Sequence, residues 1–578
     1  MLRKYGPVAL VVVAVAVAAV VVLAGGGGGG DGDADREAGR DLLAGGQAGA
    51  PAPAARMPLT YAEAEAAGTA ADHDWGERCD PATGRVRLPS VYAAPCVPVF
   101  AGDNGGATGP GVTGEAITIV RYLPAEGLSA SSLAPGAVDE SAEDQARTLR
   151  QFVDNYASRA ELYGRRIELA DFAATGPAGD VVAAGADAVD IAESLDPFAV
   201  RGGPQLDGGV FAEELAGRGI LCLDCAGAVP PDTWEALEPD VWGSLPTADQ
   251  FLATFGAWSA GLSGHATGRD EAPPAAFAGE GLRDERRRIG VIHFDQDPPL
   301  VAVADEDVPA GIELIESYVF DVATMPQKAV ELVARFRTEG ITTVVFLGDP
   351  IMPRHLLSAA TEQGWFPEWV STGTFLTDTN FFARGSDQAQ MAHAFGVSQL
   401  AAPTTRDLQD PVRLYRWYHG GTDTLPPART QYPLLQFAAR FVVSGIHMAG
   451  PDLTADTFPR GLFRIPPAGG GPTTARLSYG DWGLFPATDY AGIDDASEIW
   501  WDPAAAGPDE FGLDGTGLWR RAHDGRRFAG EDDAPAPDPF GDPGGTVTVV
   551  DELPPEDTPP EYPPPPGSPA AGSEEGPA

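Results

Sequence analysis

The sequence predicts an α/β fold of two lobes, in which each lobe is a mostly parallel sheet flanked by helices and crossover segments join the two. Three observations lead to this expectation. Residues 288–370 alternate strand, helix, strand, helix and strand in one unbroken run, which is typical of a parallel sheet. The stretch 344–347, Val-Val-Phe-Leu, is continuously apolar, as in strands that are covered on both faces. Residues 111–258 repeat the alternation, so a second unit of the same kind is expected.

The later unit, residues 288–396, is expected to form lobe 2. Its first helix is predicted from the apolar residues Val330, Val333 and Phe336, which lie three apart with charged residues elsewhere on the cylinder. Gly340 ends that helix. The other elements expected here are strands at 289–294, 312–322, 341–348, 369–374 and 394–397, and a helix at 355–363.

The earlier unit, residues 111–260, is expected to form the first part of lobe 1. Residues 141–144, Ser-Ala-Glu-Asp, form a capping box that begins a helix with Leu149, Phe152 and Tyr156 on one face. The other elements expected here are strands at 117–122, 165–169, 188–191 and 220–223, and helices at 210–216 and 247–258.

Two further regions complete the body of the protein. Residues 261–287, rich in Gly, Pro and Arg, are expected to be an inserted surface loop near the passage between the lobes. Residues 397–530 are expected to return to lobe 1 and to end in late strands. The elements predicted here are helices at 433–448 and 452–463 and strands at 475–479 and 497–501.

The chain begins with a targeting segment, residues 1–25. Arg3 and Lys4 precede an uncharged apolar run, residues 8–24, whose length lies between a signal-peptide core and a full membrane span. A cleaved signal and a retained anchor both remain open. Either one places the rest of the chain outside the cytoplasm, secreted or anchored to the cell membrane. Residues 26–110 are expected to be a linker followed by an arm that cysteines clamp.

The four cysteines agree with export. Cys79 and Cys96 flank a turn-rich segment, and a disulfide between them would clamp a small loop. Cys222 and Cys225 form a C-x-x-C pair, which a local disulfide or two packed thiols explain better than a redox pair or half of a metal site. No second pair and no nearby histidine completes a zinc tetrahedron.

Charge and motifs exclude several functions. A formal net charge of −45 argues against nucleic acid as a partner, because nucleic-acid binding needs a basic surface. The patterns of a nucleophile elbow, a phosphate-binding loop, a dinucleotide-binding turn and a zinc protease are all missing. We therefore expect no catalytic residue, cofactor or metal site, and we expect His293 and His447 to be packed in the core.

The end of the chain, residues 531–578, differs from the body. It contains no Lys or Arg and twelve acidic residues, and proline is frequent in it. Such a composition is typical of disordered segments. We expect this tail to be disordered and dispensable for stability.

Several motifs resemble one family. The turn 111–114, Gly-Val-Thr-Gly, precedes the first strand, and Gly164, Arg165, Ile167 and Leu169 follow the first helix at the spacing of that family. Residues 341–348 and the later Gly-Trp pair 364–365 match its second lobe. The chain thus resembles the extracytoplasmic solute-binding proteins of ABC importers, in the branch of leucine/isoleucine/valine-binding proteins. The resemblance implies a type I periplasmic binding fold and a receptor that delivers a small solute to a permease.

The resemblance also suggests where the ligand binds. Ligands of parallel sheets bind beyond the carboxyl ends of the strands. The candidate contacts are Tyr122, Asp196, Phe198 and Ala226 in lobe 1 and Asp295, Asp349 and Thr374 in lobe 2. Asp196 and Asp349 are expected to face one solvent-filled groove. The aspartates could instead be turn formers and the aromatic residues core. The family's hydroxyl residues for α-amino acids are missing, which argues against such a ligand.

The sequence is compatible with two alternative functions. An uncleaved anchor would make the same fold a membrane-tethered ligand sensor or scaffold, attached to the cytoplasmic membrane by its N-terminal segment. An exported hydrolase is the less favoured interpretation, because the sequence lacks the nucleophile and metal patterns that hydrolysis needs.

Overall fold

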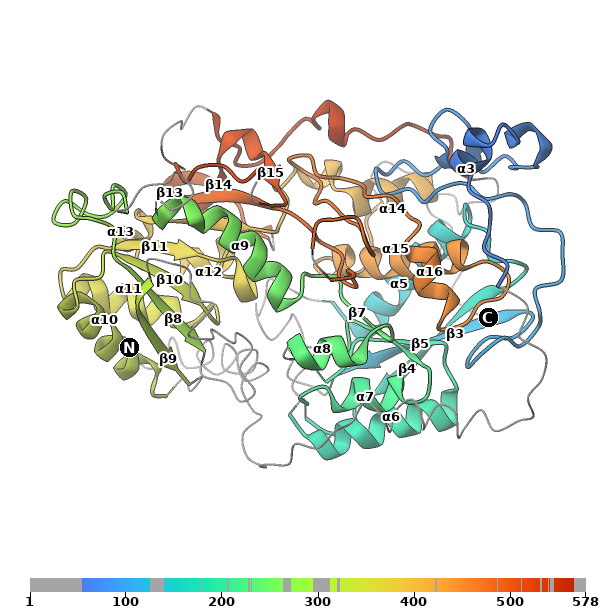
Figure 1. The fold of residues 1–578 in the computed structure, drawn as a ribbon, viewed down its shortest axis with the longest axis horizontal. Coiled ribbons are helices and arrows are strands. Elements are labelled where there is room, and N and C mark those ends of the chain that lie inside the picture. The colour runs from blue at the N-terminus through green and yellow to red at the C-terminus, as the bar shows by residue number, and fades with distance from the viewer. Residues whose placement is uncertain are drawn as a thin grey trace.

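The computed structural model describes residues 55–565, with gaps at 125–139, 178, 205–206, 227–228, 230, 264–271, 295–311, 320–322, 421–423, 486, 511, 531–532, 539 and 541–544. Two lobes lie side by side along the longest axis of the molecule (Figure 1). The predicted signal or anchor segment, residues 1–25, lies outside the described residues.

Lobe 1 is built on a parallel sheet with the strand order β4-β3-β5-β6-β7. Its strands are β3 (Ala116–Leu123), β4 (Arg166–Ala173), β5 (Ala199–Arg201), β6 (Leu221–Leu223) and β7 (Val241–Trp242). The first strand in the sequence therefore lies second in the sheet. This is a doubly wound order, with the reversal between β3 and β5.

Lobe 2 repeats that order. Strands β9-β8-β10-β11-β12 are parallel, and the antiparallel strands β13 and β14 extend the sheet beyond β12. The strands are β8 (Ile289–Phe294), β9 (Ile312–Tyr318), β10 (Thr343–Leu347), β11 (Glu368–Ser371), β12 (Ala394–Ser398), β13 (Ala496–Pro508), β14 (Asp514–Arg521) and β15 (Arg527–Phe528). The predicted fold class, two mostly parallel α/β lobes, is confirmed.

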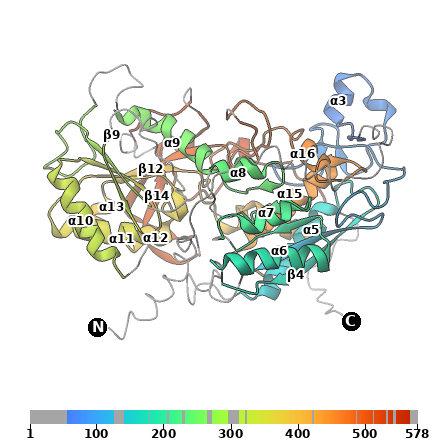
Figure 2. The same ribbon diagram turned by 60° about the horizontal axis from the view of Figure 1, so that its bottom comes forward.

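Helices cover both sheets (Figure 2). Those of lobe 1 are α5 (Ala142–Ala157), α6 (Val181–Leu195), α7 (Val210–Ala216), α8 (Pro231–Leu237), α14 (Asp410–His419), α15 (Tyr432–Ala449) and α16 (Thr457–Leu462). Those of lobe 2 are α9 (Ala248–Ser263), α10 (Met325–Thr338), α11 (Met352–Glu362), α12 (Asn380–Arg384) and α13 (Gln388–Met391). The nearly all-apolar α15 is buried along most of its length, because it packs between the lobe 1 sheet and its neighbouring helices.

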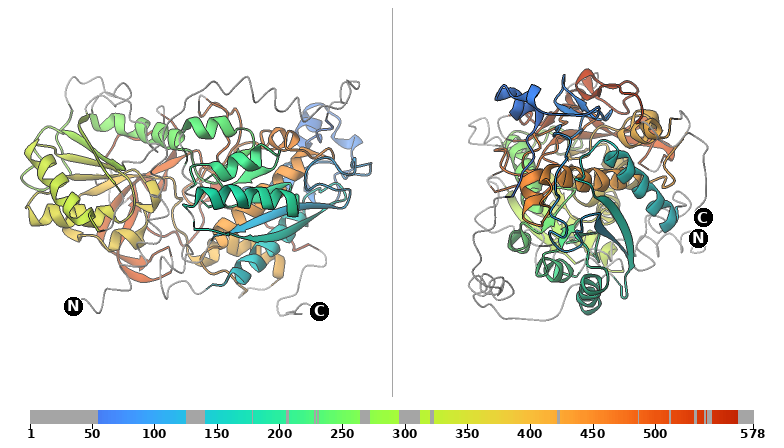
Figure 3. Two further views of the ribbon diagram at one scale, coloured as in Figure 1. Left: turned by 90° about the horizontal axis from the view of Figure 1, so that it is seen from below. Right: turned by 90° about the vertical axis from the view of Figure 1, so that its right-hand side faces the viewer.

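Before residue 530, three segments of the described chain pass between the lobes. Helix α9 follows β7 of lobe 1 but packs Phe255, Trp258 and Leu262 against the sheet of lobe 2. Residues 399–409 lead from β12 back to α14, and residues 480–495 lead from lobe 1 to β13. The left view of Figure 3 shows the two lobes side by side from below.

An arm precedes lobe 1 and covers the end of it that lies away from lobe 2 (Figure 1). It contains α3 (Tyr61–Ala66), β1 (Cys79–Asp80) and β2 (Arg85–Val86). The predicted disulfide between Cys79 and Cys96 is confirmed, with an S–S distance of 2.05 Å. Cys222 and Cys225 are joined as well and are fully buried at the end of β6.

Two predicted strands are wrong. Residues 188–191 lie inside helix α6, whose N-cap Asp180 accepts hydrogen bonds from the backbone of residues 182 and 183. Ala184, Ala188 and Ile191 are its buried apolar residues, and their spacing of four and three is that of a helix face. Residues 475–479 form no regular strand, since Leu477 makes only isolated bridges to Ala468 and Ile493.

The expectation of a surface loop at 261–287 is corrected at Arg287. Its side chain is buried and forms two hydrogen bonds of 2.8 Å with the carboxylate of Glu368 in β11. This ion pair attaches the segment to the sheet of lobe 2.

The expectation of a disordered tail is also wrong for the described residues between 533 and 565. Asp557 is only 1% exposed, and its carboxylate accepts hydrogen bonds from Thr473 and Thr474. The Tyr562 hydroxyl donates to Asp80 over 2.8 Å. A few specific anchors therefore hold a segment whose average composition is that of a disordered chain.

Candidate functional site

The topology places the candidate site at the carboxyl edges of the two sheets. The strand order reverses between β3 and β5 in lobe 1 and between β8 and β10 in lobe 2, and parallel sheets bind ligands beyond the carboxyl ends at such points. Helix α9 and residues 399–409 begin shortly after β7 and β12, so the chain leaves both sheets at these same edges. The two edges therefore border the passage between the lobes.

Three candidate contacts of lobe 1 belong to its core. Tyr122 is 5% exposed, and its hydroxyl donates to Asp187 over 2.8 Å. Phe198 is 2% exposed and contacts the ring of Phe458 edge to face. Ala226 follows β6, at the expected edge, but is equally buried.

Asp196 lies at the wrong edge of the lobe 1 sheet. It is the left-handed C-cap of α6 and precedes β5, so it belongs to the amino end of that strand. The error follows from the strand predicted at 188–191, because a helix in that place moves the next loop to the other edge.

Asp349 follows β10 at the expected edge of lobe 2 but is 1% exposed. Its Oδ2 accepts a hydrogen bond of 2.5 Å from the Tyr318 hydroxyl, and its Oδ1 accepts from the backbone N–H groups of Ile351 and Met352. The carboxylate thus holds the turn that leads into α11. The predicted shared groove between Asp196 and Asp349 is not formed.

The last two candidate contacts have different outcomes. Thr374 follows β11, is half-buried, and its hydroxyl lies 3.0 Å from that of Thr372. It stays a candidate contact at the carboxyl edge. Asp295 lies outside the described residues.

A residue that the sequence analysis missed, Arg201, ends β5 at the reversal point of lobe 1. The side chain is half-buried, and burial lowers its pKa while nearby Asp224 opposes that shift. Its Nε has no hydrogen-bond partner within the described part of the chain. The signal in the sequence was a single charge directly after the apolar pair 199–200, at the end of a strand. Arg201 can meet a negatively charged group of a ligand.

The edge beside Arg201 is aromatic. Trp242 ends β7 and lies among Phe441, Tyr479 and Tyr490, with centroid distances of 4.9 to 5.7 Å. The Trp242 Nε1 and the Tyr479 hydroxyl are buried and lack partners within the residues described. A cavity of about 10 Å³ opens at this edge, and its lining residues are Leu223, Asp224, Trp242, Gly243, Ser244, Phe437, Ala438 and Phe441.

Exposed apolar side chains follow strands in both lobes. Leu245, three residues after β7, is 55% exposed. Val319 directly follows β9 and is 49% exposed, and Leu376, five residues after β11, is 45% exposed with a φ of 66°. These three side chains offer single apolar contacts at the carboxyl edges.

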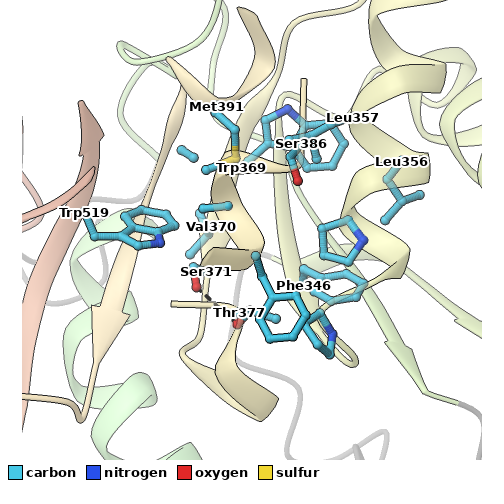
Figure 4. A pocket seen from close by; sticks show the side chains of 15 residues that line it. Phe346, Leu356, Leu357, Trp369, Val370, Ser371, Thr377, Ser386, Met391 and Trp519 are labelled. Carbon is cyan, nitrogen blue, oxygen red and sulfur yellow. Dashed lines mark hydrogen bonds between the residues drawn. The ribbon is translucent and has the colours of Figure 1, made fainter. Parts of the chain in front are cut away.

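Lobe 2 also contains an apolar cavity of about 60 Å³ between β10, β11 and the helices beside them (Figure 4). Phe346, Leu356, Trp369 and Met391 are among the side chains around it, and Ser371 lies within hydrogen-bonding distance of Thr377. A cavity of roughly 150 Å³ can hold benzene, and this one is less than half as large. The cavity is therefore too small for a solute of that size, and we do not assign the site to it.

Side chains bind the crossing segments to each other. The buried Arg527 in β15 donates to the Gln399 carbonyl in one crossing, and to the carbonyl and carboxylate of Asp495 in another. Gln250 of α9 donates to Asp489 over 2.5 Å. The crossings thus form one hydrogen-bonded hinge region.

Among the described residues, no helix is long and apolar enough to cross a bilayer. Within that same part of the chain, no group of three or more His, Cys, Asp or Glu side chains is arranged to hold a metal ion.

Comparison with known proteins gives similarities of fold. No family model and no curated protein matches the chain. It is similar to a fatty acid ABC transporter substrate-binding protein from Thermomonospora curvata, at 15% identity and a TM-score of 0.46, over 76% of this chain and 99% of that one. It is similar to an R. palustris solute-binding protein in complex with 4-hydroxybenzoate, at 11% identity and a TM-score of 0.47, over 74% and 99%.

A third similar structure is the branched-chain amino acid transporter substrate-binding protein LivJ from Streptococcus pneumoniae in complex with isoleucine. The identity is 12% and the TM-score 0.42, over 70% of this chain and all of that one. These three structures are binding proteins of ABC transporters, the class that the sequence resembles.

Proposed function

We propose that this chain is an extracytoplasmic receptor that captures a small solute between its lobes and presents it to an ABC-type importer. The observation that carries the proposal is the repeated strand order of the two lobes, together with three crossings that meet the sheets at the edges where parallel sheets bind ligands. Lobes joined in this way can close about their connecting segments. Closure shields a solute from water and creates a surface that a permease can recognise.

The chemistry of the edges favours a ligand with an anionic group and an apolar body. Arg201 offers a half-buried cation whose buried Nε has no partner among the described residues, while Leu245 and Leu376 offer apolar contacts from opposite lobes. Asp349, which would have favoured a cation, has its oxygens occupied by donors of lobe 2. An α-amino acid is not the ligand that we propose, because the sequence lacks the hydroxyl residues that the family uses for it.

The proposed role is binding without catalysis and without a cofactor. The disulfide between Cys79 and Cys96 supports an extracytoplasmic location, since such bonds persist in oxidising compartments. If residues 1–25 stay attached, the same receptor would be tethered to the membrane.

The test is a thermal-shift screen of the full chain against aromatic carboxylates, straight-chain fatty acids, branched amino acids, sugars and polyamines. A solute that binds only the folded state at 100 times its Kd stabilises it by about 2.7 kcal/mol. We expect the hits among the carboxylates and fatty acids. Hits confined to sugars or polyamines would contradict the assigned ligand class, and a panel without a hit would contradict the receptor.

Arg201→Gln supplies the residue-level test. It should weaken binding of an anionic hit by roughly tenfold or more, because a charge-assisted hydrogen bond contributes about 1.5–3 kcal/mol. Arg147→Gln is the matched control, since Arg147 is exposed on α5 and pairs only with its helix neighbour Asp144 among the described residues. Equal affinities of the two variants would remove Arg201 from the site.

A further inference from the structure

The last described residues, 545–565, lie along both lobes, and we call this segment the C-terminal brace. We propose that the brace is a fourth connection between the lobes, which limits how far they separate. Figure 1 shows the chain passing from β15 in lobe 2 to the neighbourhood of α3 beside lobe 1. The proposal goes beyond the receptor function, because it concerns the range of lobe motion and not the ligand.

The brace begins on lobe 2. Just upstream of it, the ring of Phe540 lies 5.1 Å from those of Phe277 and Trp500 and 6.1 Å from that of Phe395. Val547 then exchanges two backbone hydrogen bonds of 2.9 Å with Arg521 at the end of β14. Aromatic packing and paired backbone bonds therefore fix the first end of the brace to the sheet of lobe 2.

The middle of the brace contacts the hinge region. The Val550 N–H donates to the Pro403 carbonyl over 2.8 Å, and its carbonyl accepts from Thr405 over 2.9 Å. Both partners belong to the crossing at residues 399–409. This part of the brace therefore pairs directly with a segment that must bend when the lobes move.

Asp557 is the most buried anchor of the brace. Its Oδ2 accepts from the backbone N–H and the hydroxyl of Thr473, each over 2.7 Å, and its Oδ1 accepts from the Thr474 hydroxyl. A Cβ on Gly471 would lie 2.0 Å from that Oδ1, so the loop at 471–474 has room for the carboxylate only because residue 471 is glycine. The loop is thus shaped to receive Asp557.

The far end of the brace lies on lobe 1 and its arm. The Tyr562 hydroxyl donates to Asp80 over 2.8 Å, beside the disulfide of Cys79. The Tyr562 carbonyl accepts from the indole N–H of Trp417 in α14 over 2.8 Å, and the Pro563 carbonyl accepts from Arg159 over 3.2 Å. These bonds attach the brace to the part of lobe 1 that lies away from lobe 2.

Anchors at both ends make the segment a restraint. Val547 and Tyr562 are fifteen residues apart, and a chain of that length spans at most about 50 Å. Prolines at 554, 555, 559, 560 and 563–565 stiffen it, because proline-rich chains adopt extended conformations. Any separation of the lobes that moves Arg521 away from Trp417 must therefore stretch the brace or break one of its anchors. A tail that contacted only one lobe would not restrict this separation.

The test measures the separation of the lobes without solute. Spin labels at V182C in α6 of lobe 1 and V330C in α10 of lobe 2 use residues that are 82% and 47% exposed. Truncation after Gly530 removes the brace, and truncation after Pro565 is the control that keeps it. We expect the distance distribution of the shorter chain to broaden and to shift to longer distances. Superimposable distributions would overturn the proposal.

A point variant covers the case in which the shorter chain does not fold. Asp557→Ala removes the buried anchor, while Asp551→Ala changes an exposed acid of the same segment. We expect a broadened distribution for Asp557→Ala alone, and identical distributions for the two variants would also overturn the brace. No solute is present in this experiment, so such a result would not contradict the receptor function, which the thermal-shift screen tests separately.

Discussion

The Tyr318 hydroxyl donates a 2.5 Å hydrogen bond to Oδ2 of Asp349, and this contact joins the end of β9 to the end of β10. The other carboxylate oxygen accepts from the backbone N–H groups of Ile351 and Met352 at the start of α11. Asp349 therefore connects two strands and a helix at the carboxyl edge of lobe 2.

We predict that Asp349→Ala lowers the free energy of unfolding by about 1–3 kcal/mol, because it leaves a buried hydroxyl and two backbone N–H groups at the start of α11 without their acceptor. Urea denaturation measures the change. Asp190→Ala, at an exposed position of α6, should change stability by less than about 0.5 kcal/mol. Weakened ligand binding with unchanged stability would contradict this structural role and would indicate that Asp349 contacts the ligand.

Arg527→Gln should lower the free energy of unfolding by more than Asp349→Ala does. The guanidinium and the Asp495 carboxylate are 1% and 3% exposed, and breaking a buried pair costs about 3–5 kcal/mol because the other charge stays buried. Arg526→Gln is the adjacent control at an exposed position. Equal melting temperatures of the two variants would mean that the hinge does not depend on this ion pair.

Asp494 should make stability depend on pH. Burial, together with the neighbouring Asp489 carboxylate, raises the pKa of Asp494 to about 9. The folded state thus favours the protonated acid. Its contribution to the free energy of unfolding is fully present below the unfolded pKa of about 3.9 and is lost as the pH rises through 9.

Asp494→Asn keeps a neutral side chain at every pH, so it should flatten the fall in unfolding free energy between pH 5 and 9 in urea titrations. The exposed Asp481→Asn serves as the control and should retain the slope of the parent chain. A slope that persists in Asp494→Asn would assign the pH dependence to other groups.

Loss of the disulfide between Cys79 and Cys96 should cost about 3 kcal/mol, which is the chain-entropy value for a loop of this length. The double variant C79S/C96S and denaturation in urea give the value. Mass mapping of the unreduced exported protein should recover the two cysteines in one linked peptide pair, and free thiols there would contradict the bond.

The sequence predicted the elements of lobe 2 more reliably than the site. The continuous apolar run at 344–347 was predicted to be a strand, and β10 lies within the predicted bounds. The apolar run around Ala188 fits either a strand or a helix. Asp180, the N-cap of α6, is the residue that indicates the helix. The wrong strand prediction there moved Asp196 to the opposite edge of the sheet, because site residues were chosen by their position after a strand.

The brace could not have been predicted from composition. An acidic, proline-rich segment has too few apolar residues to form a core of its own. Its order depends on partners far away in the sequence, since Asp557 is held by Thr473 and Thr474, and Tyr562 by Asp80 and Trp417. Long-range pairing of this kind leaves no local pattern.

We propose that the carboxyl edges of the two lobes form one ligand site. Spin labels at V182C in α6 of lobe 1 and V330C in α10 of lobe 2 leave the proposed ligand contacts intact, and they report lobe closure in the full chain with the solute that raises its melting temperature most. We predict that this solute shortens and narrows the distance distribution. A solute that stabilises the protein but leaves that distribution unchanged would contradict the claim.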